Sequence, residues 1–353
     1  MNCLIINPGS SDPKSVKISK LTGLPTDPLA IPIIINFPDF PSGISYCEAA
    51  KLLVPVLQDY MLNTDFILFR CPAFNFNVLG ITQLTEELAE NFSSKIAIQH
   101  GSEIGFWLAY ELTQIYKIPA VFSRGIPTSR LPDYATITGH PNIKKTCMSH
   151  WEAVEGVAHH VATKEKPVSE VEFILIMLGS GTGIYLWEKP GAISAFKIRQ
   201  WEGPMSPSSI GGLDTLALLD FMLSQGETSL KEARKKISAL VGSKGGFQLF
   251  DPRWLDLREF RKDVENFHPL ATSLFEAWII QISGKVGEVK LSMKQPKQPT
   301  PVYFYGGGSN WPELVSRISD RLSEHLFLNP EVITIDPENE FFISQAIEFS
   351  KSL

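Results

Sequence analysis

The sequence predicts an α/β protein built from two halves of similar plan. Apolar segments of strand length alternate with helical segments along the chain, which is typical of α/β layers. The order strand, tight turn, strand occurs near the N-terminus and again near residue 175. The 353 residues correspond to about two domains of ordinary size. We therefore expect two α/β domains.

The first half begins with a strand, a turn and a second strand. The apolar run Leu-Ile-Ile at 4–6 precedes a segment dense in turn formers, and 15–19 then alternates polar and apolar residues. The proline-rich stretch 27–43 predicts an irregular excursion. Helices are expected at 45–62, 79–92 and 102–116, and strands at 65–70, 95–100 and 119–122.

The second half repeats this plan. A helix at 150–163 precedes a buried strand at 171–178, a glycine turn at 179–183 and strands at 184–187 and 192–198. The remaining pattern predicts helices at 210–224, 228–240, 256–266, 270–291 and 338–353, and strands at 302–305 and 332–335. We expect the last strand and helix to return to the first domain. The domains would then be 1–147 with 332–353, and 148–331.

Composition excludes several functional classes. The net charge of −6 argues against a broad nucleic-acid-binding face and against a polybasic membrane anchor. No apolar run approaches the ~18 residues of a bilayer-spanning helix, and the N-terminus lacks the pattern of a signal peptide. The four cysteines are far apart and form no CxxC pair, which indicates reduced thiols. We expect a cytoplasmic protein without nucleic-acid or membrane partners.

The turn at 7–14 is a candidate phosphate site. It offers the Asn7 amide, the hydroxyls of Ser10 and Ser11, the cation of Lys14 and several backbone N–H groups. Such a concavity suits phosphate oxygens. Asn-Pro-Gly is also common turn chemistry, so an ordinary hairpin turn is the alternative.

Two glycine-rich segments follow strands in the second half. Gly179 and Gly181 lie in Gly-Ser-Gly-Thr-Gly, where the absence of side chains would let a phosphate approach the backbone. Gly306, Gly307 and Gly308 follow the strand at 302–305 and precede a helix. These glycines favour either nucleotide contacts or tight turns.

Polar side chains stand at the ends of three predicted strands of the first half. They are Arg70, His100 and Ser123-Arg124, and open α/β sheets bind ligands at the carboxyl ends of strands. Arg70 suits bidentate binding of a carboxylate or phosphate, with an exposed surface cation as the alternative. Taken alone, His100 and His150 fit structural roles better than catalytic ones.

Several segments in register resemble the butyrate kinases. They include Leu-Ile-Ile-Asn-Pro-Gly-Ser at 4–10 with Lys14, Trp-Glu-Gly-Pro-Met-Ser-Pro at 201–207 and Val-Gly-Ser-Lys-Gly-Gly at 241–246. The run from His100 through Ile-Pro-Ala at 118–120 to His150 also fits. The strand–turn elements are similar to the phosphate-1, phosphate-2 and adenosine motifs of the acetate and sugar kinase, Hsp70 and actin superfamily. The resemblance covers nearly the whole chain.

This resemblance implies two ribonuclease H-like (actin-like ATPase) domains with an interdomain nucleotide cleft. It implies ATP-dependent phosphorylation of a short-chain carboxylate to an acyl phosphate, with Mg²⁺, by a homodimer or higher homo-oligomer. The catalytic positions would be Asn7, Arg70, His100 and His150. Nucleotide and phosphate would be bound by Ser10, Ser11, Lys14, Gly179, Gly181, Gly306, Gly307 and Gly308. Glu340 would be the magnesium-associated carboxylate, with a first-turn helix carboxylate as the alternative.

The chain departs from the butyrate kinase pattern at three positions. Arg124 stands where the family has an aspartate, Ser209 where it has a phosphate-stabilising arginine, and Met177 where it has a histidine. Phosphoryl transfer depends on neutralising the charge of the transferred group. A catalytically degenerate nucleotide- or acyl-phosphate-binding protein is therefore the alternative function. Two further readings stay open: a shift of the alignment near Arg124, or compensation by Arg124 for the arginine missing at Ser209.

Overall fold

The computed structural model describes most of the chain and divides it into two compact units. The described residues are 1–8, 15–26, 28–36, 44–70, 81–95, 103–123, 151–162, 166–188, 192–195, 203–212, 214–226, 229–242, 244–293, 299–334 and 336–352. Unit 1 comprises the described residues up to 123, those at 151–160 and those at 336–352, and unit 2 comprises those from 161 to 334. The division of the chain at 147/148 and 331/332 stays a prediction.

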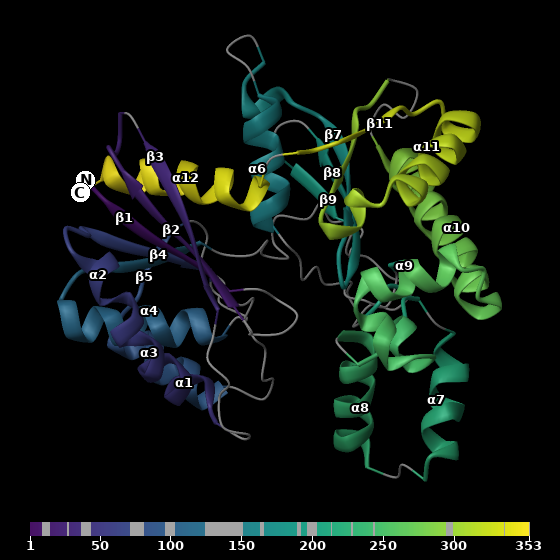
Figure 1. Cartoon of the computed structure of the whole chain (residues 1–353), viewed down its shortest axis with the longest axis horizontal. Helices are drawn as coiled ribbons and strands as arrows, with labels where there is room; N and C mark the ends of the chain where they lie inside the picture. Colours follow the sequence, from purple (N-terminus) through teal and green to yellow (C-terminus); the bar gives the residue numbers. More distant parts are fainter. Residues whose placement is uncertain are drawn as a thin grey trace, which may run out of the picture. The chain divides into compact units, whose positions relative to one another are not determined.

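Unit 1 is built on a six-stranded sheet in the order β3-β2-β1-β4-β6-β5 (Figure 1). Neighbours β1, β4 and β6 are parallel, and the other pairs are antiparallel. The strands are β1 (Cys3–Pro8), β2 (Ser15–Thr22), β3 (Leu29–Asn36), β4 (Phe66–Arg70), β5 (Thr82–Gln83) and β6 (Ala120–Ser123). The helices are α1 (Tyr46–Leu53), α2 (Gln58–Met61), α3 (Glu86–Lys95), α4 (Glu103–Tyr116), α6 (Trp151–Val161) and α12 (Pro337–Ser350).

Both faces of the unit 1 sheet are covered, because consecutive residues of β1 and β4, which point to opposite faces, are all buried. Leu4, Ile6, Ile67 and Phe69 share a core with α1 and α4. On the other face, the Phe66 ring lies edge-on against Phe349 of α12, with 5.1 Å between ring centroids. The last helix therefore packs within unit 1, but the expected return of the last strand was wrong: Pro330–Val332 pairs with Val302–Phe304 in the sheet of unit 2.

The expectation of an irregular segment at 27–43 was wrong in part, because β3 occupies Leu29–Asn36. β3 pairs with β2 along its whole length, with Pro32 opposite Ser19. It is an edge strand, so one side of its backbone needs no sheet partner and tolerates a proline. The predicted strand at 95–100 lies almost entirely outside the described residues.

Unit 2 is built on a five-stranded sheet in the order β11-β10-β7-β8-β9. Its strands are β7 (Phe173–Leu178), β8 (Thr182–Glu188), β9 (Ala192–Ala195), β10 (Val302–Tyr305) and β11 (Pro330–Val332). Its helices are α7 (Thr215–Ser224), α8 (Leu230–Gly242), α9 (Leu257–Glu265), α10 (Pro269–Ser292) and α11 (Pro312–Leu326). These bounds agree with the predicted helices to within a few residues, except that α7 begins later.

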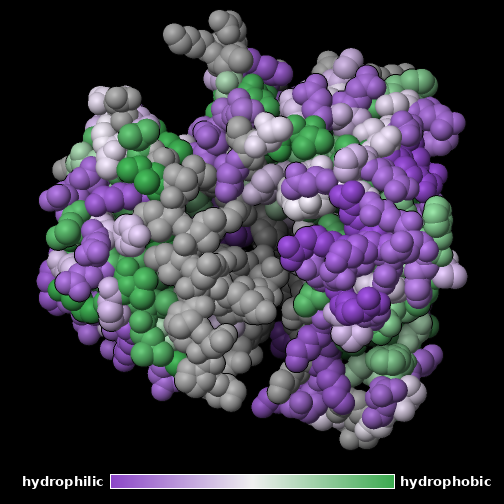
Figure 2. Space-filling model, viewed as in Figure 1, coloured by the Kyte–Doolittle hydropathy of each residue, from purple (hydrophilic) through white to green (hydrophobic). Residues whose placement is uncertain are grey.

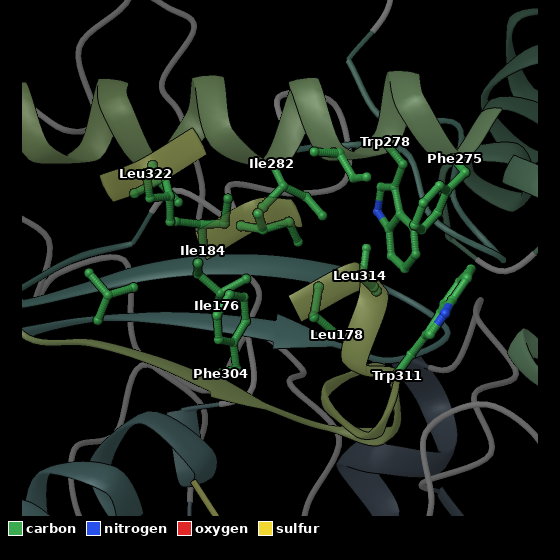
Figure 3. Packing of buried hydrophobic residues seen from close by; sticks show 14 of the residues in the cluster. Ile176, Leu178, Ile184, Phe275, Trp278, Ile282, Phe304, Trp311, Leu314 and Leu322 are labelled. Atoms are coloured by element: carbon green, nitrogen blue, oxygen red, sulfur yellow. The ribbon is translucent and has the colours of Figure 1, made fainter. Parts of the chain in front are cut away.

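The core of unit 2 fixes the carboxyl end of β7. Ile176 and Leu178 of β7 and Ile184 of β8 point toward α10 and α11, where Phe275 and Trp278 lie with Trp311 (Figure 3). The rings of Phe275 and Trp311 stack with 4.6 Å between centroids. This packing holds the turns after β7 and β10 in place.

The surface of both units mixes hydrophilic and hydrophobic residues (Figure 2).

None of the helices within the described ranges has the length and apolar character needed to cross a bilayer.

Candidate functional site

In unit 1, the structure brings Asn7 and Arg70 to one edge of the sheet. β1 and β4 are parallel neighbours, and Ile6 pairs with Phe69, so Asn7 and Arg70 are the next residues on the two strands. Arg70 also lies opposite Ser123 at the end of β6. Carboxyl ends of parallel strands are where open α/β sheets bind ligands. The expected grouping of strand-end polar residues is therefore observed for Arg70 and Ser123, and Asn7 lies at the same edge of the sheet.

Arg70 forms an ion pair with a buried glutamate. Its Nη2 atom lies 3.7 Å from Oε2 of Glu152, which belongs to α6. The two side chains are 11% and 3% exposed. A carboxylate this deeply buried requires a cationic or hydrogen-bonding neighbour. The cation expected to bind substrate is thus also a counter-ion of the protein's own carboxylate.

Six of the residues singled out in the sequence lie outside the described residues. They are Ser10, Ser11, Lys14, His100, Arg124 and His150. Glu340 is described: it is half-buried in the first turn of α12, and its N–H donates to the Asp336 carbonyl at 3.2 Å. Across the described portion of the chain, no three His, Cys, Asp or Glu side chains are grouped in a way that could hold a metal ion.

In unit 2, two glycine segments meet at Leu178. The turn after β7 is closed by a hydrogen bond from the Gly179 N–H to the Gly181 carbonyl at 3.1 Å. Gly306, after β10, has φ +101°, and a Cβ there would lie 2.5 Å from the Leu178 carbonyl oxygen. Only glycine fits that backbone and that approach. Met177, next to Leu178, lies in β7 opposite Gly183 of β8.

A third segment, 206–209, forms hydrogen bonds to the glycine turn at 179–183. Ser208 donates its N–H and its hydroxyl to the Ser180 carbonyl, at 2.9 and 2.7 Å. The carbonyl of Ser208 in turn accepts from the Gly245 N–H at 3.1 Å. Gly246 has φ +75°, and a Cβ there would collide with the Ser206 carbonyl. Segments 179–183, 206–209 and 245–246 therefore form one backbone network.

Ser209 is a buried member of that network, 5% exposed. Its N–H donates to the Ser206 hydroxyl at 3.1 Å, and its carbonyl accepts from the Ser206 N–H at 2.9 Å. The Cα atom of residue 209 therefore lies in a buried, tight turn. A longer side chain at this position would have to extend out of the turn to contact a ligand.

Glu152 and Ser208 were not found from the sequence. A signal existed for Glu152, because it stands next to apolar residues of the predicted helix at 150–163 that turn out to be buried. A charge in such a position requires a partner. Ser208 lies among turn formers, and its acceptor is a backbone carbonyl, which sequence patterns do not reveal.

Comparison with known proteins identifies the relatives of this chain. No protein-family model matches it. It is 26% identical over 216 residues to a probable butyrate kinase 2 of Caldanaerobacter subterraneus subsp. tengcongensis, covering 61% of this chain and 59% of that protein. A probable butyrate kinase of Maridesulfovibrio salexigens is 25% identical over 226 residues, covering 63% of this chain and 61% of the relative. The matched region thus spans about 60% of the length of these relatives.

Solved structures of acetate and propionate kinases have the same fold as this chain. Porphyromonas gingivalis acetate kinase aligns with a TM-score of 0.73 at 16% identity, covering 99% of both chains. A propionate kinase of Francisella tularensis aligns with a TM-score of 0.72 at 16% identity, covering 98% of both. The chain is similar in sequence to butyrate kinases and in fold to acetate and propionate kinases. The resemblance found in the sequence is thereby confirmed, and so is the two-domain fold of the actin-like ATPases.

Proposed function

We propose that this butyrate kinase relative phosphorylates a short-chain carboxylate with ATP, giving ADP and an acyl phosphate. The observation that carries the proposal is the end of β7, where the glycine segments 179–183 and 306–308 meet at Leu178. By resemblance, these two segments correspond to the phosphate-2 and adenosine motifs of the superfamily. The relatives named as butyrate, acetate and propionate kinases support the reaction class.

Unit 2 is proposed to bind the nucleotide. Gly179 and Gly181 leave the turn backbone open to β- and γ-phosphate oxygens, whose charge backbone N–H groups stabilise. Gly306, Gly307 and Gly308 form the corresponding turn for adenosine. Both turns rest on Leu178, so the core of unit 2 fixes their spacing.

Unit 1 is proposed to bind the carboxylate. Arg70 would hold its charge, beside the Asn7 amide at the same sheet edge. One carboxylate oxygen then attacks the γ-phosphorus, the bond from phosphorus to the bridging oxygen of ADP breaks, and that oxygen takes the electron pair. By resemblance, Ser10, Ser11 and Lys14 would contact the transferred phosphate, and His100 and His150 would donate to it.

Mg²⁺ is the expected partner of ATP in this reaction. It binds through one or two carboxylates with phosphate oxygens and water, so a three-ligand protein cluster is not required. Glu340, with Asp336 one turn away, offers carboxylates of that kind. When bound, the ion would neutralise part of the phosphate charge. We assign no further role to these two residues.

Two observations favour a second candidate, a nucleotide- or acyl-phosphate-binding protein without turnover. Arg70 is already paired with Glu152, which weakens its attraction for an anionic substrate. Ser209 lies in a buried turn, and its neutral side chain cannot stabilise the charge of the phosphoryl group. Losing such a cation typically raises the barrier by several kcal/mol.

ADP release coupled to a detection enzyme would decide between the two candidates. Acetate, propionate, butyrate and isobutyrate would be the acceptors, and hydroxylamine would trap the acyl phosphate. Acceptor-dependent ADP release with a trapped product supports the kinase. Nucleotide binding without product supports the second candidate.

We further propose that the protein is cytoplasmic and forms a homo-oligomer. The free thiols of Cys3 and Cys47 support the location, and the family resemblance supports the assembly.

A further inference from the structure

The proposed carboxylate site holds a negative charge next to its positive one. Nη2 of Arg70 lies 3.7 Å from Oε2 of Glu152, and both residues belong to unit 1. Glu152 stands in the first turn of α6, where the positive end of the helix dipole favours a carboxylate. Its side chain is 3% exposed, so water screens this charge little. A ligand at Arg70 therefore meets both charges.

A simple carboxylate is a poor match for this pair. Its negative charge is attracted by Arg70 and repelled by Glu152, and the two protein charges are only 3.7 Å apart. Coulomb energies change little over so short a difference in distance, so the repulsion offsets much of the attraction. The ligand would also compete with Glu152 for the arginine, although a buried carboxylate needs that compensation.

A ligand that carries both charges removes the conflict. Its carboxylate can lie against Arg70 while its ammonium group lies against Glu152, so that every charge has an opposite neighbour. The 3.7 Å between Nη2 and Oε2 is close to the distance between the ammonium nitrogen and the carboxylate oxygens of an α-amino acid. Asn7 lies beside Arg70 at the same sheet edge, and its amide carries both donors and an acceptor.

We infer that the acceptor substrate is a short α-amino carboxylate, bound as a zwitterion between Arg70 and Glu152. This inference rests on the proposed function and names its substrate class. A carboxylate oxygen of the amino acid attacks the γ-phosphorus, the bond to the bridging oxygen of ADP breaks, and an aminoacyl phosphate forms. The ammonium group keeps its protons and takes no part in the transfer. Glu152 is then the residue that distinguishes amino acids from fatty acids.

Three ligands of one carbon skeleton test the preference. Propionate carries only the carboxylate, propylamine only the ammonium group, and alanine both. Titration calorimetry of the full wild-type chain, with and without ADP, measures their affinities. We expect one enantiomer of alanine to bind at least tenfold more tightly than propionate or propylamine. Propionate binding as tightly as alanine, or no binding of alanine at millimolar concentration, overturns the inference.

Glu152→Gln should reverse the preference. The ammonium group loses its partner, and Arg70 is released for a simple carboxylate, so alanine should bind at least tenfold more weakly and propionate more tightly than in the wild type. Glu155→Gln is the matched control: Glu155 lies on the same helix, 3.9 Å from His159, and its removal should leave the preference unchanged. A purely structural ion pair would leave the ratio of the two affinities constant in Glu152→Gln, which overturns the inference. If this variant does not fold, the wild-type ligand series decides alone.

Trapping with hydroxylamine separates this inference from the proposed function. Tight binding of alanine without a hydroxamate product supports the zwitterion site and refutes the kinase. A hydroxamate from propionate, with no binding of alanine, supports the kinase and overturns the zwitterion site.

Discussion

Arg70 and Glu152 are an ion pair between the end of a central strand and a helix that follows much later in the sequence, with 3.7 Å between Nη2 and Oε2. Both side chains are largely removed from water. Removing one member of such a pair leaves an uncompensated buried charge, which is far more destabilising than the loss of a surface pair. Arg70 is therefore expected to support the fold of unit 1 as well as to bind substrate.

Arg70→Ala should lower the free energy of unfolding by about 3–5 kcal/mol, because Glu152 is left buried without its cation. Arg70→Ala/Glu152→Gln should be clearly more stable than Arg70→Ala, since it removes that charge too. Urea unfolding measures both. The control is Arg258→Ala, whose pair with Asp256 is 86% exposed at the arginine and should contribute at most about 1 kcal/mol. Equal losses at Arg70 and Arg258 would contradict the structural role.

Measurements of ligand affinity distinguish the proposed role of Arg70 in substrate binding from its role in stability. In Arg70→Ala/Glu152→Gln, we expect acyl phosphate affinity to fall by an order of magnitude or more, because the charge-assisted bonds to arginine are lost. ATP affinity should stay near that of the wild type. Glu152→Gln alone should strengthen acyl phosphate binding, because the competing carboxylate is gone. Isothermal titration calorimetry with acetyl phosphate and ATP measures these affinities. Unchanged acyl phosphate affinity in the double variant would refute the assignment of Arg70.

Most of the strands and helices that carry the site could be predicted from the sequence, because apolar periodicity and turn residues determine them locally. β3 was missed because its prolines outweighed its Ile-rich pattern, and its place at the sheet edge is a property of the whole sheet. The grouping of Arg70 with Ser123 followed from the rule on strand ends, whereas Asn7 was assigned to the phosphate turn and its place beside Arg70 was not foreseen. Their pairing register and the partner Glu152 depend on contacts between distant segments, which one sequence does not specify.

The network around Ser180 could not be predicted, for a different reason. Its bonds run to backbone carbonyls and its fit depends on φ angles, as at Gly246. The residue types indicate only that a turn is present.

Nucleotide should raise the melting temperature of the protein. Ligand bound to the native state at about a hundred times its Kd adds roughly 2.7 kcal/mol to stability. We expect this shift with millimolar ATP or ADP in differential scanning fluorimetry, and a smaller one with adenosine alone. No shift with either nucleotide, with or without Mg²⁺, would count against nucleotide binding by unit 2.

Ser208→Ala should weaken nucleotide binding through the glycine turn. The variant loses the 2.7 Å hydroxyl bond to the Ser180 carbonyl and keeps the N–H bond. A neutral hydrogen bond contributes about 1 kcal/mol, so we expect ATP affinity to fall by up to about fivefold and acyl phosphate affinity to stay constant. Ser273→Ala is the control, because its hydroxyl bond to the Pro269 carbonyl is exposed and on α10. An equal loss for both ligands would mean that Ser208 acts on general stability.

The buried amino group of Lys290 should make the free energy of unfolding depend on pH in the alkaline range. It is 7% exposed, its Nζ donates to the Thr300 hydroxyl at 2.6 Å, and burial lowers its pKa from the ordinary 10.5. Between the folded and unfolded pKa values, the unfolded chain binds more protons, so the free energy of unfolding rises with pH in that range. Urea unfolding of wild type and Lys290→Met should show this rise only in the wild type. Lys262→Met, with an exposed amino group, should retain it. The same slope in all three proteins would refute the prediction.

Reversal of the altered positions Arg124 and Ser209 tests whether the chain has lost turnover. On the second candidate function, a binding protein without turnover, butyrate kinase activity is weak or absent in the wild type. Arg124→Asp alone restores the family's carboxylate but leaves no arginine at 209 to meet the phosphoryl charge. Ser209→Arg alone adds a second cation, and it also strains the turn where Ser209 is bonded to Ser206. Neither single variant should gain activity.

The double variant Arg124→Asp/Ser209→Arg should exceed the product of the two single effects, because residues that act as a unit are not additive. Coupled ADP release with butyrate measures kcat/KM for all four proteins, and thermal melting checks that Ser209→Arg is folded. Independent effects at the two positions would show that they do not cooperate in this chain. Strong wild-type turnover that disappears in Arg124→Ala would instead show that Arg124 has replaced the missing arginine, since then a guanidinium still meets the phosphoryl charge.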